Sequence, residues 1–174
     1  AQVCDYSRED VCLNWLARDH VVPILTFHLK GVYLGCDQVE VPIQSVLADP
    51  LAWLDHLATS QVPPTWAPTF GFRMGANAVA DRPERSWDLS AMKYFMNAGE
   101  QVTRPVVSDF LAALEPFGVA ANTMQPAFGM AEVCTCMTYE NDFEVDRSAP
   151  CVRKSSLSGR LEQTTPDDPE GISF

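Results

Sequence analysis

Short apolar runs alternate with stretches of helical periodicity along most of this chain, and this alternation constrains the fold more than any other feature. Residues 11–16 and 92–97 have the length and composition of buried strands. Residues 105–116 carry apolar side chains at helical spacing. Strands that alternate with helices form parallel sheets, because each helix returns the chain to the start of the next strand. The sequence therefore predicts an α/β fold, a mostly parallel sheet with flanking helices.

Further elements follow from the same pattern. A helix over 19–34 is apolar almost all round, so we expect it to be buried. Asp49 is expected to cap another helix with Pro50 at its first position, with Leu47, Leu51, Leu54 and Ala58 on one face. Part of 70–85 is predicted as helix, and Gly118 is expected to end the helix over 105–116. The remaining predicted strands are 39–43, 65–67, 123–125 and 133–139, with a turn over 126–129.

The amino-acid composition excludes several classes of protein. Hydrophobic residues make up 47% of the 174 residues, which is enough for a folded core. The formal net charge of -11 disfavours binding to nucleic acids, because the phosphates would be repelled. No apolar run reaches the roughly 18 residues of a membrane span. Residues 1–10 show no secretory signal pattern. We therefore expect a cytoplasmic protein without a membrane span.

The six cysteines are scattered, and several lie in apolar runs. A chain of this size with a real core does not need a disulfide framework, so we interpret them as reduced thiols. Cys134 and Cys136 could suggest a metal site, but zinc ligands are usually two to four residues apart and no second pair lies nearby. Alternating side chains on one strand are the simpler interpretation.

The composition changes near residue 141. Polar residues, proline and aspartate become frequent, as in 155–158 and 164–169. We predict that 1–145 form the α/β part and that 146–174 form a hairpin or loop segment.

Two turns combine small residues with a carboxylate at the expected ends of successive strands. In parallel sheets, ligands bind at the carboxyl ends of strands. A glycine lets a ligand approach the backbone, and an aromatic ring can stack on a base. Each turn alone could be a tight turn beside a surface glutamate. The two segments are Asn97-Ala98-Gly99-Glu100 and Phe128-Gly129-Met130-Ala131-Glu132.

Taken together, in this order and at this spacing, the two segments resemble motifs of the adenylate-forming superfamily. This superfamily includes acyl-CoA synthetases, fatty-acyl-AMP ligases and the adenylation domains of nonribosomal peptide synthetases. Its pattern is small-Gly-Glu at the first turn and aromatic-Gly-x-Thr/Ser/Ala-Glu at the second. The resemblance covers nearly the whole chain, through 110–118, 66–68, 49–54 and 14–20. It implies that 1–145 are the central part of the large N-terminal AMP-binding domain.

The resemblance implies roles for both segments. Ala98, Gly99 and Glu100 would line the adenine pocket, and Phe128 would pack against adenine. The backbone of Gly129, Met130 and Ala131 would complete this site for ATP or AMP, and Glu132 would hold Mg²⁺, which prefers oxygen ligands. Without the motif, Phe128 could be ordinary core packing and Glu132 a charge at a helix N-terminus. The two glycine-bearing strand ends would form half of a cradle for an adenylate.

His20 matches the histidine that borders the acyl pocket and phosphates in fatty-acyl-AMP ligases. The surrounding pattern departs from that family at four positions, Ala17, Arg18, Asp19 and Val21, so a buried, hydrogen-bonded histidine stays an alternative. Ala131 replaces a hydroxyl residue found in many members. The Phe-Asp pair that grips an amine is not evident after His20, which favours an acyl or other amine-free acid.

The family's phosphate loop and the lysine of its C-terminal lid are not evident in these residues. We therefore expect an internal fragment of a ligase that forms an acyl-adenylate and pyrophosphate, with no catalysis by the fragment alone. The acyl group would pass to a carrier-protein phosphopantetheine thiol or to coenzyme A. A non-catalytic remnant or docking module of a polyketide or peptide synthetase, and an unrelated doubly wound nucleotide-binding domain, are the alternatives.

Overall fold

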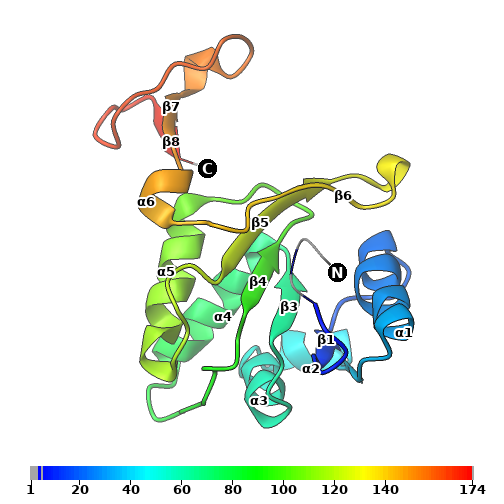
Figure 1. The fold of residues 1–174 in the computed structure, drawn as a ribbon. Coiled ribbons are helices and arrows are strands. Elements are labelled where there is room, and N and C mark those ends of the chain that lie inside the picture. Colours follow the sequence, from blue (N-terminus) through cyan, green and yellow to red (C-terminus); the bar gives the residue numbers. More distant parts are fainter. Residues whose placement is uncertain (1–3, 5, 174) are drawn as a thin grey trace.

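A parallel sheet runs through the computed structural model, which describes residue 4 and residues 6–173 (Figure 1). Its strands β3 (Pro64–Ala67), β4 (Tyr94–Asn97) and β5 (Met124–Gly129) lie side by side and parallel. β6 (Cys136–Tyr139) pairs antiparallel with β5 and extends the order to β3-β4-β5-β6. Residues 1–3, 5 and 174, at the outer ends of the two predicted segments, lie outside the described residues.

A second, two-stranded ladder adjoins this sheet at β3. It consists of β1 (Cys12–Asn14) and β2 (Gln38–Glu40), which are also parallel. The Thr65 hydroxyl donates to the Leu13 carbonyl at 3.4 Å, which joins β3 to β1. The prediction of an α/β fold with a mostly parallel sheet is confirmed.

Helices cover both faces of the sheet. The segments η2 and α1 lie on one face, and α3, α4 and α5 pack on the other. The helical segments are the π-helix η2 (Pro23–Leu29), α1 (Lys30–Leu34), α2 (Ile43–Ala48), α3 (Leu51–Thr59), α4 (Thr69–Asp81), α5 (Arg104–Leu114) and α6 (Val145–Ser148), with 3-10 turns η3 (Glu115–Phe117), η4 (Ala131–Val133) and η5 (Lys154–Ser156).

The core divides along β4, because alternate side chains of a strand point to opposite faces. Phe95 packs among the helices, with its ring centroid 5.0 Å from that of Phe110. Phe110 in turn lies 4.9 Å from Phe72 of α4. Tyr94 and Met96 point to the other face, into the cluster that η2 and α1 cover. Both faces of β4 are therefore buried.

Several predicted elements are confirmed with their end signals. The Asp49 carboxylate accepts a hydrogen bond from the Leu51 backbone N–H at 3.1 Å at the start of α3. The predicted helix over 105–116 is α5 followed by η3. Gly118 ends η3 with a φ of 90°, a conformation that glycine adopts without strain.

The helix predicted over 19–34 is shorter and less buried than expected. The helical stretch begins after His20, and much of it is π-helix. Only one side of it faces the sheet, so the prediction that it is buried all round is wrong. Its exposed apolar side chains are Ile24 (40%), Leu29 (48%), Val32 (62%) and Tyr33 (85%).

Three further details differ from the predictions. Residues 126–129 belong to β5 and not to a turn, because the Pro126 carbonyl accepts from the Glu140 N–H at 2.9 Å as the chain returns along β6. Ile43 begins α2 rather than ending a strand. Leu47 lies on that same helix and is 51% exposed, so it does not share the buried face of α3.

The cysteines are free in the structure. Cys134 has a φ of 78° and precedes β6, so Cys134 and Cys136 do not alternate along one strand, and that interpretation is wrong. Within residues 4 and 6–173, no group of three or more His, Cys, Asp or Glu side chains could hold a metal ion.

The C-terminal residues form an antiparallel hairpin. β7 (Cys151–Arg153) pairs with β8 (Gly171–Ser173), and this hairpin projects beyond α6 in Figure 1. The division between 145 and 146 stays a prediction. In the part of the chain that the structure describes, no helix is long and apolar enough to cross a membrane.

Candidate functional site

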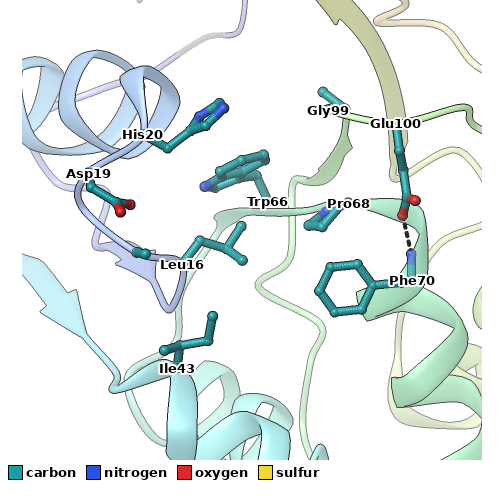
Figure 2. A pocket seen from close by; sticks show the side chains of 11 residues that line it. Leu16, Asp19, His20, Ile43, Trp66, Pro68, Phe70, Gly99 and Glu100 are labelled. Atoms are coloured by element: carbon teal, nitrogen blue, oxygen red, sulfur yellow. Dashed lines mark hydrogen bonds between the residues drawn. The ribbon is translucent and has the colours of Figure 1, made fainter.

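A pocket of about 420 Å³ opens where β1, β3 and β4 end, at the carboxyl edge expected for a ligand site (Figure 2). Apolar side chains form most of its wall, and the carboxylates of Asp19 and Glu100 are present at its rim. We call it the first pocket. Its lining residues are Leu16, Ala17, Asp19, His20, Ile43, Trp66, Pro68, Phe70, Ala98, Gly99 and Glu100.

The turn after β4 places three of the predicted residues at this pocket. Gly99 has a φ of 91°, which lets the chain turn sharply there without strain. The Glu100 carboxylate accepts a hydrogen bond from the backbone N–H of Phe70, in the first turn of α4 (Figure 2). A negative charge at a helix N-terminus is favourable, so α4 helps to hold the Glu100 side chain in place.

A second pocket, of about 450 Å³, lies between the segment after β4 and the strands β5 and β6. Phe128 lines it with a side chain that is 58% exposed, so ordinary core packing does not explain this ring. Glu100 lines both pockets. Glu100 and Phe128, one residue from each of the two predicted segments, therefore line one pocket together. The lining residues of the second pocket are Glu100, Gln101, Val102, Pro126, Ala127, Phe128, Thr138, Tyr139 and Glu140.

The chain between β5 and β6 is a tight connection. Gly129 lies at a β-bulge, and a Cβ built on it would fall 1.5 Å from the Thr135 carbonyl oxygen. Only glycine fits at this close approach. Met130, which is 44% exposed, leads into η4, where Ala131 and Glu132 are both exposed.

Glu132 is the residue predicted from the sequence to hold a magnesium ion. Its carboxylate is exposed, and no hydrogen bond or ion pair to another described residue is found. An uncommitted carboxylate fits Mg²⁺, which binds proteins through one or two carboxylates and completes its shell with water and phosphate oxygens. The ion would supply positive charge beside the phosphates.

His20 lies in the loop after β1 and points toward the first pocket (Figure 2). Its Nδ1 atom lies 3.3 Å from the backbone nitrogen of Val22, which donates to it. The side chain is exposed, which excludes the alternative of a buried histidine. Because Nδ1 accepts a hydrogen bond, Nε2 carries the proton in the neutral ring and can donate to a ligand.

The sequence analysis assigned no site role to the other seven lining residues of the first pocket, which include Trp66, Leu16, Ile43 and Asp19. Trp66 lies in β3, two residues before Pro68, and its place near a strand end did not show that its ring faces a ligand pocket. Leu16 lies in the loop after β1 and Ile43 begins α2, and only the packing of these segments brings both side chains to the pocket. Asp19 adds a carboxylate whose side chain Figure 2 shows near the same pocket.

Comparisons with known proteins fit this geometry. No family model matches the chain. Aspulvinone E synthetase of Aspergillus terreus is 38% identical over 126 residues, which are 70% of this chain and 14% of that protein. The structure of the adenylation domain of a keto acid-selecting nonribosomal peptide synthetase module, bound to a keto acyl adenylate, matches 99% of this chain and 32% of that chain, with a TM-score of 0.93 and 32% identity.

A fatty acid AMP ligase from Legionella pneumophila shares the fold, with a TM-score of 0.88 and 20% identity over 97% of this chain and 30% of that one. The chain belongs to the adenylate-forming superfamily and has the fold of part of its large N-terminal domain. Proteins more than 30% identical to this chain include a nonribosomal peptide synthetase of Aspergillus terreus and the adenylation domain of the keto acid-selecting module. The chain spans about a seventh of the curated relatives' length.

Proposed function

We propose that these residues form part of the acid-binding and nucleotide-binding region of an ATP-dependent ligase that makes an acyl-adenylate. The observation that carries this proposal is that Glu100 lines two pockets at the carboxyl edge of one parallel sheet. One pocket is apolar and suits the body of an acid, and the other presents the exposed ring of Phe128 to a base. An acyl-adenylate has these two parts joined by a phosphate.

In the proposed reaction, a carboxylate oxygen of the acid attacks the α-phosphorus of ATP, and the bond from that phosphorus to pyrophosphate breaks. Positioning and charge neutralisation carry most of such a reaction. Phe128 would stack on adenine, with the backbone of 98–100 and 129–131 beside it. His20 would donate from Nε2 toward the acyl phosphate, and Glu132 would hold Mg²⁺.

We propose an amine-free acid as substrate, with 2-keto acids as the first class to test. One solved structure that matches 99% of this chain is an adenylation domain bound to a keto acyl adenylate. Asp19 is a reason to include amino acids, since a carboxylate at the pocket rim could pair with an amine. The acceptor of the acyl group would be the thiol of a carrier-protein phosphopantetheine or of coenzyme A.

The test is pyrophosphate exchange into ATP, measured with pairs of 2-keto acids and their amino-acid counterparts. The protein used is the full natural polypeptide that carries these residues, beside the 174-residue chain alone. We expect exchange by the full polypeptide with keto acids and none by the 174-residue chain. Binding of AMP without exchange for any acid would instead favour a non-catalytic remnant. Absence of both exchange and nucleotide binding would contradict the proposed site.

A further inference from the structure

A single buried amide, that of Asn14, joins the two ladders of strands beside the first pocket. Asn14 is 2% exposed and ends β1. Its Nδ2 donates to the Leu16 carbonyl at 2.8 Å and to the Glu40 carboxylate at 3.0 Å. Its Oδ1 accepts from the Leu16 backbone N–H at 3.3 Å and from the Trp66 indole N–H at 3.4 Å. The two donors and two acceptor positions of the amide are all used.

Two partners of Asn14, Leu16 and Trp66, line the first pocket, which Asn14 itself does not line. Leu16 lies at the start of the loop that carries Asp19 and His20. Trp66 is the side chain of β3 that lines the pocket. The first ladder is β1–β2 and the second begins at β3, so side chains must fix the distance between these two walls. The bonds of Asn14 do this beside the pocket, together with the hydrogen bond from the Thr65 hydroxyl to the Leu13 carbonyl.

Glu40 extends the connection to the surface. One oxygen of the Glu40 carboxylate accepts the hydrogen bond from Asn14 Nδ2. The Arg18 guanidinium forms an ion pair with the other oxygen at 2.9 Å. Arg18 belongs to the same loop as His20, so the loop is held at two positions. Arg18 is also one of the positions at which the sequence departs from the pattern of fatty-acyl-AMP ligases, which have an apolar residue there.

Only an amide satisfies these four partners. An aspartate at position 14 keeps the shape but loses both donors and places a carboxylate against that of Glu40. An apolar residue would leave the Trp66 N–H and the Leu16 backbone groups without partners, and unsatisfied buried polar groups are costly. The Trp66 ring rests on Phe27 on its other side, with ring centroids 6.3 Å apart. The hydrogen bond that the Trp66 indole N–H donates to Asn14 therefore selects the rotation of a ring that is otherwise held by packing.

We propose that Asn14 is the positioning residue of the acid pocket, which sets acid affinity by fixing Trp66 and the loop of 16–20 without touching the acid. This inference rests on the proposed function, because it takes the first pocket as the acid site. The second pocket, in which Phe128 would stack on adenine, is lined by residues 100–102, 126–128 and 138–140, and Asn14 makes no hydrogen bond to any of them. The effect of Asn14 is therefore specific to the acid.

The test compares variants by pyrophosphate exchange in the full natural polypeptide. Asn14→Asp is expected to raise the KM for the acid about 10- to 100-fold, the range for a buried hydrogen bond that becomes unsatisfied or repulsive. The KM for ATP should stay within about 2-fold of the parent value. Adding Glu40→Gln to Asn14→Asp lets the new amide donate to the new carboxylate, and we expect about a 5-fold recovery of the acid KM. This recovery distinguishes positioning from general damage.

Arg18→Gln is a gentler variant in case Asn14→Asp does not fold. It removes the ion pair between Arg18 and Glu40 at the surface. We expect the KM for the acid to rise about 3-fold and the melting temperature to stay unchanged. An unaltered acid KM in folded Asn14→Asp, or in Arg18→Gln if only that variant folds, would overturn the inference. So would a parallel rise of both KM values. No exchange by the parent protein would overturn the proposed function and this inference with it.

Discussion

Asn97 at the end of β4 is paired in register with Pro126 of β5. Because the two strands are parallel, the segments that follow them leave the same edge of the sheet. Gly99 and Phe128 each lie two residues beyond this pair. The Thr69 hydroxyl donates toward Oδ1 of Asn97 at 3.0 Å, which fixes the end of β4 from the α4 side. This pairing brings the two predicted motifs together, and the following predictions test what they do.

Phe128→Ala is expected to weaken binding of AMP about 10-fold, because a base that stacks on an aromatic ring gains roughly 1–3 kcal/mol. The affinity can be measured by isothermal titration calorimetry in the full natural polypeptide. Met137→Ala is a matched control, since Met137 is also exposed (54%) and does not line either pocket. Equal affinities for the two variants would show that Phe128 does not contact the base.

Glu132→Gln is expected to raise the Mg²⁺ concentration that gives half-maximal pyrophosphate exchange by about 10-fold. The amide keeps the size of the side chain but loses the charge that attracts the cation. The KM for the acid should change little, because Glu132 does not line the first pocket. Glu162→Gln, an exposed glutamate in the C-terminal segment, serves as the control. An unchanged magnesium dependence for Glu132→Gln would remove Glu132 from the metal site.

Gly129→Ala is expected to destabilise the fold by about 1–3 kcal/mol, the usual range for overpacking. Its methyl group would collide with the Thr135 carbonyl oxygen, so the bulge between β5 and β6 must open. Gly159→Ala is the control, because nothing lies within 4 Å of its added Cβ, and its effect should stay within about 0.5 kcal/mol. Urea denaturation of the two variants measures the difference. Equal stabilities would mean that the hairpin tolerates a side chain at Gly129.

Lys30→Met is expected to stabilise the fold at pH 7. Burial lowers the pKa of the Lys30 ammonium from 10.5 to about 8, and Nζ finds no hydrogen-bond partner among the described residues. The ammonium lies 2.9 Å from the centroid of the Tyr6 ring, which offsets part of this cost. The pKa difference sets an upper limit of about 3 kcal/mol for the gain.

The stability difference between Lys30→Met and the parent protein should depend on pH in a definite direction. Below pH 8 the folded and unfolded states both carry the proton, so the full cost of burying the charge is present. Between about pH 8 and 10.5 the folded state releases its proton first, and the contribution of Lys30 becomes less unfavourable as pH rises. The stability advantage of Lys30→Met should therefore shrink across this window. A constant advantage from pH 7 to 10.5 would show that Lys30 is not titrating there.

Buried acids near Lys30 act in the opposite direction. Burial raises the pKa of the Cys12 thiol to about 11, and it also raises the pKa values of Tyr6 and Tyr94. As the pH rises above the unfolded pKa of each group, the unfolded state releases its proton first, and the fold becomes less stable. The measurement is therefore the difference between parent and variant at each pH, from urea denaturation, in which most of these contributions cancel.

Local pattern was enough to predict much of the framework. Apolar spacing located the helix over 105–116 and the strand over 92–97, since a helix and a buried strand have different periods. The capping signals at Asp49 and Gly118 marked element ends, because they satisfy backbone groups within a few residues. The two motifs were placed on successive strand ends by the same local reasoning, and the structure puts them on neighbouring strands.

Long-range contacts decided the rest. Residues 126–129 have the composition of a turn, yet they extend β5 because β6 returns beside them. The apolar helix after His20 exposes Val32 and Tyr33 because only one of its sides meets the sheet.

The sequence by itself determined most of the strands and helices and the two segments that carry the motif, because those follow from local periodicity and residue chemistry. Only the tertiary structure decided that Trp66, Ile43 and Asp19 share a pocket and that Asn14 ties its walls together. These residues are separated by up to 52 positions in the chain, as Asn14 and Trp66 are, and no local pattern records a contact over that distance. Their meeting depends on how strands and helices pack once the chain has folded.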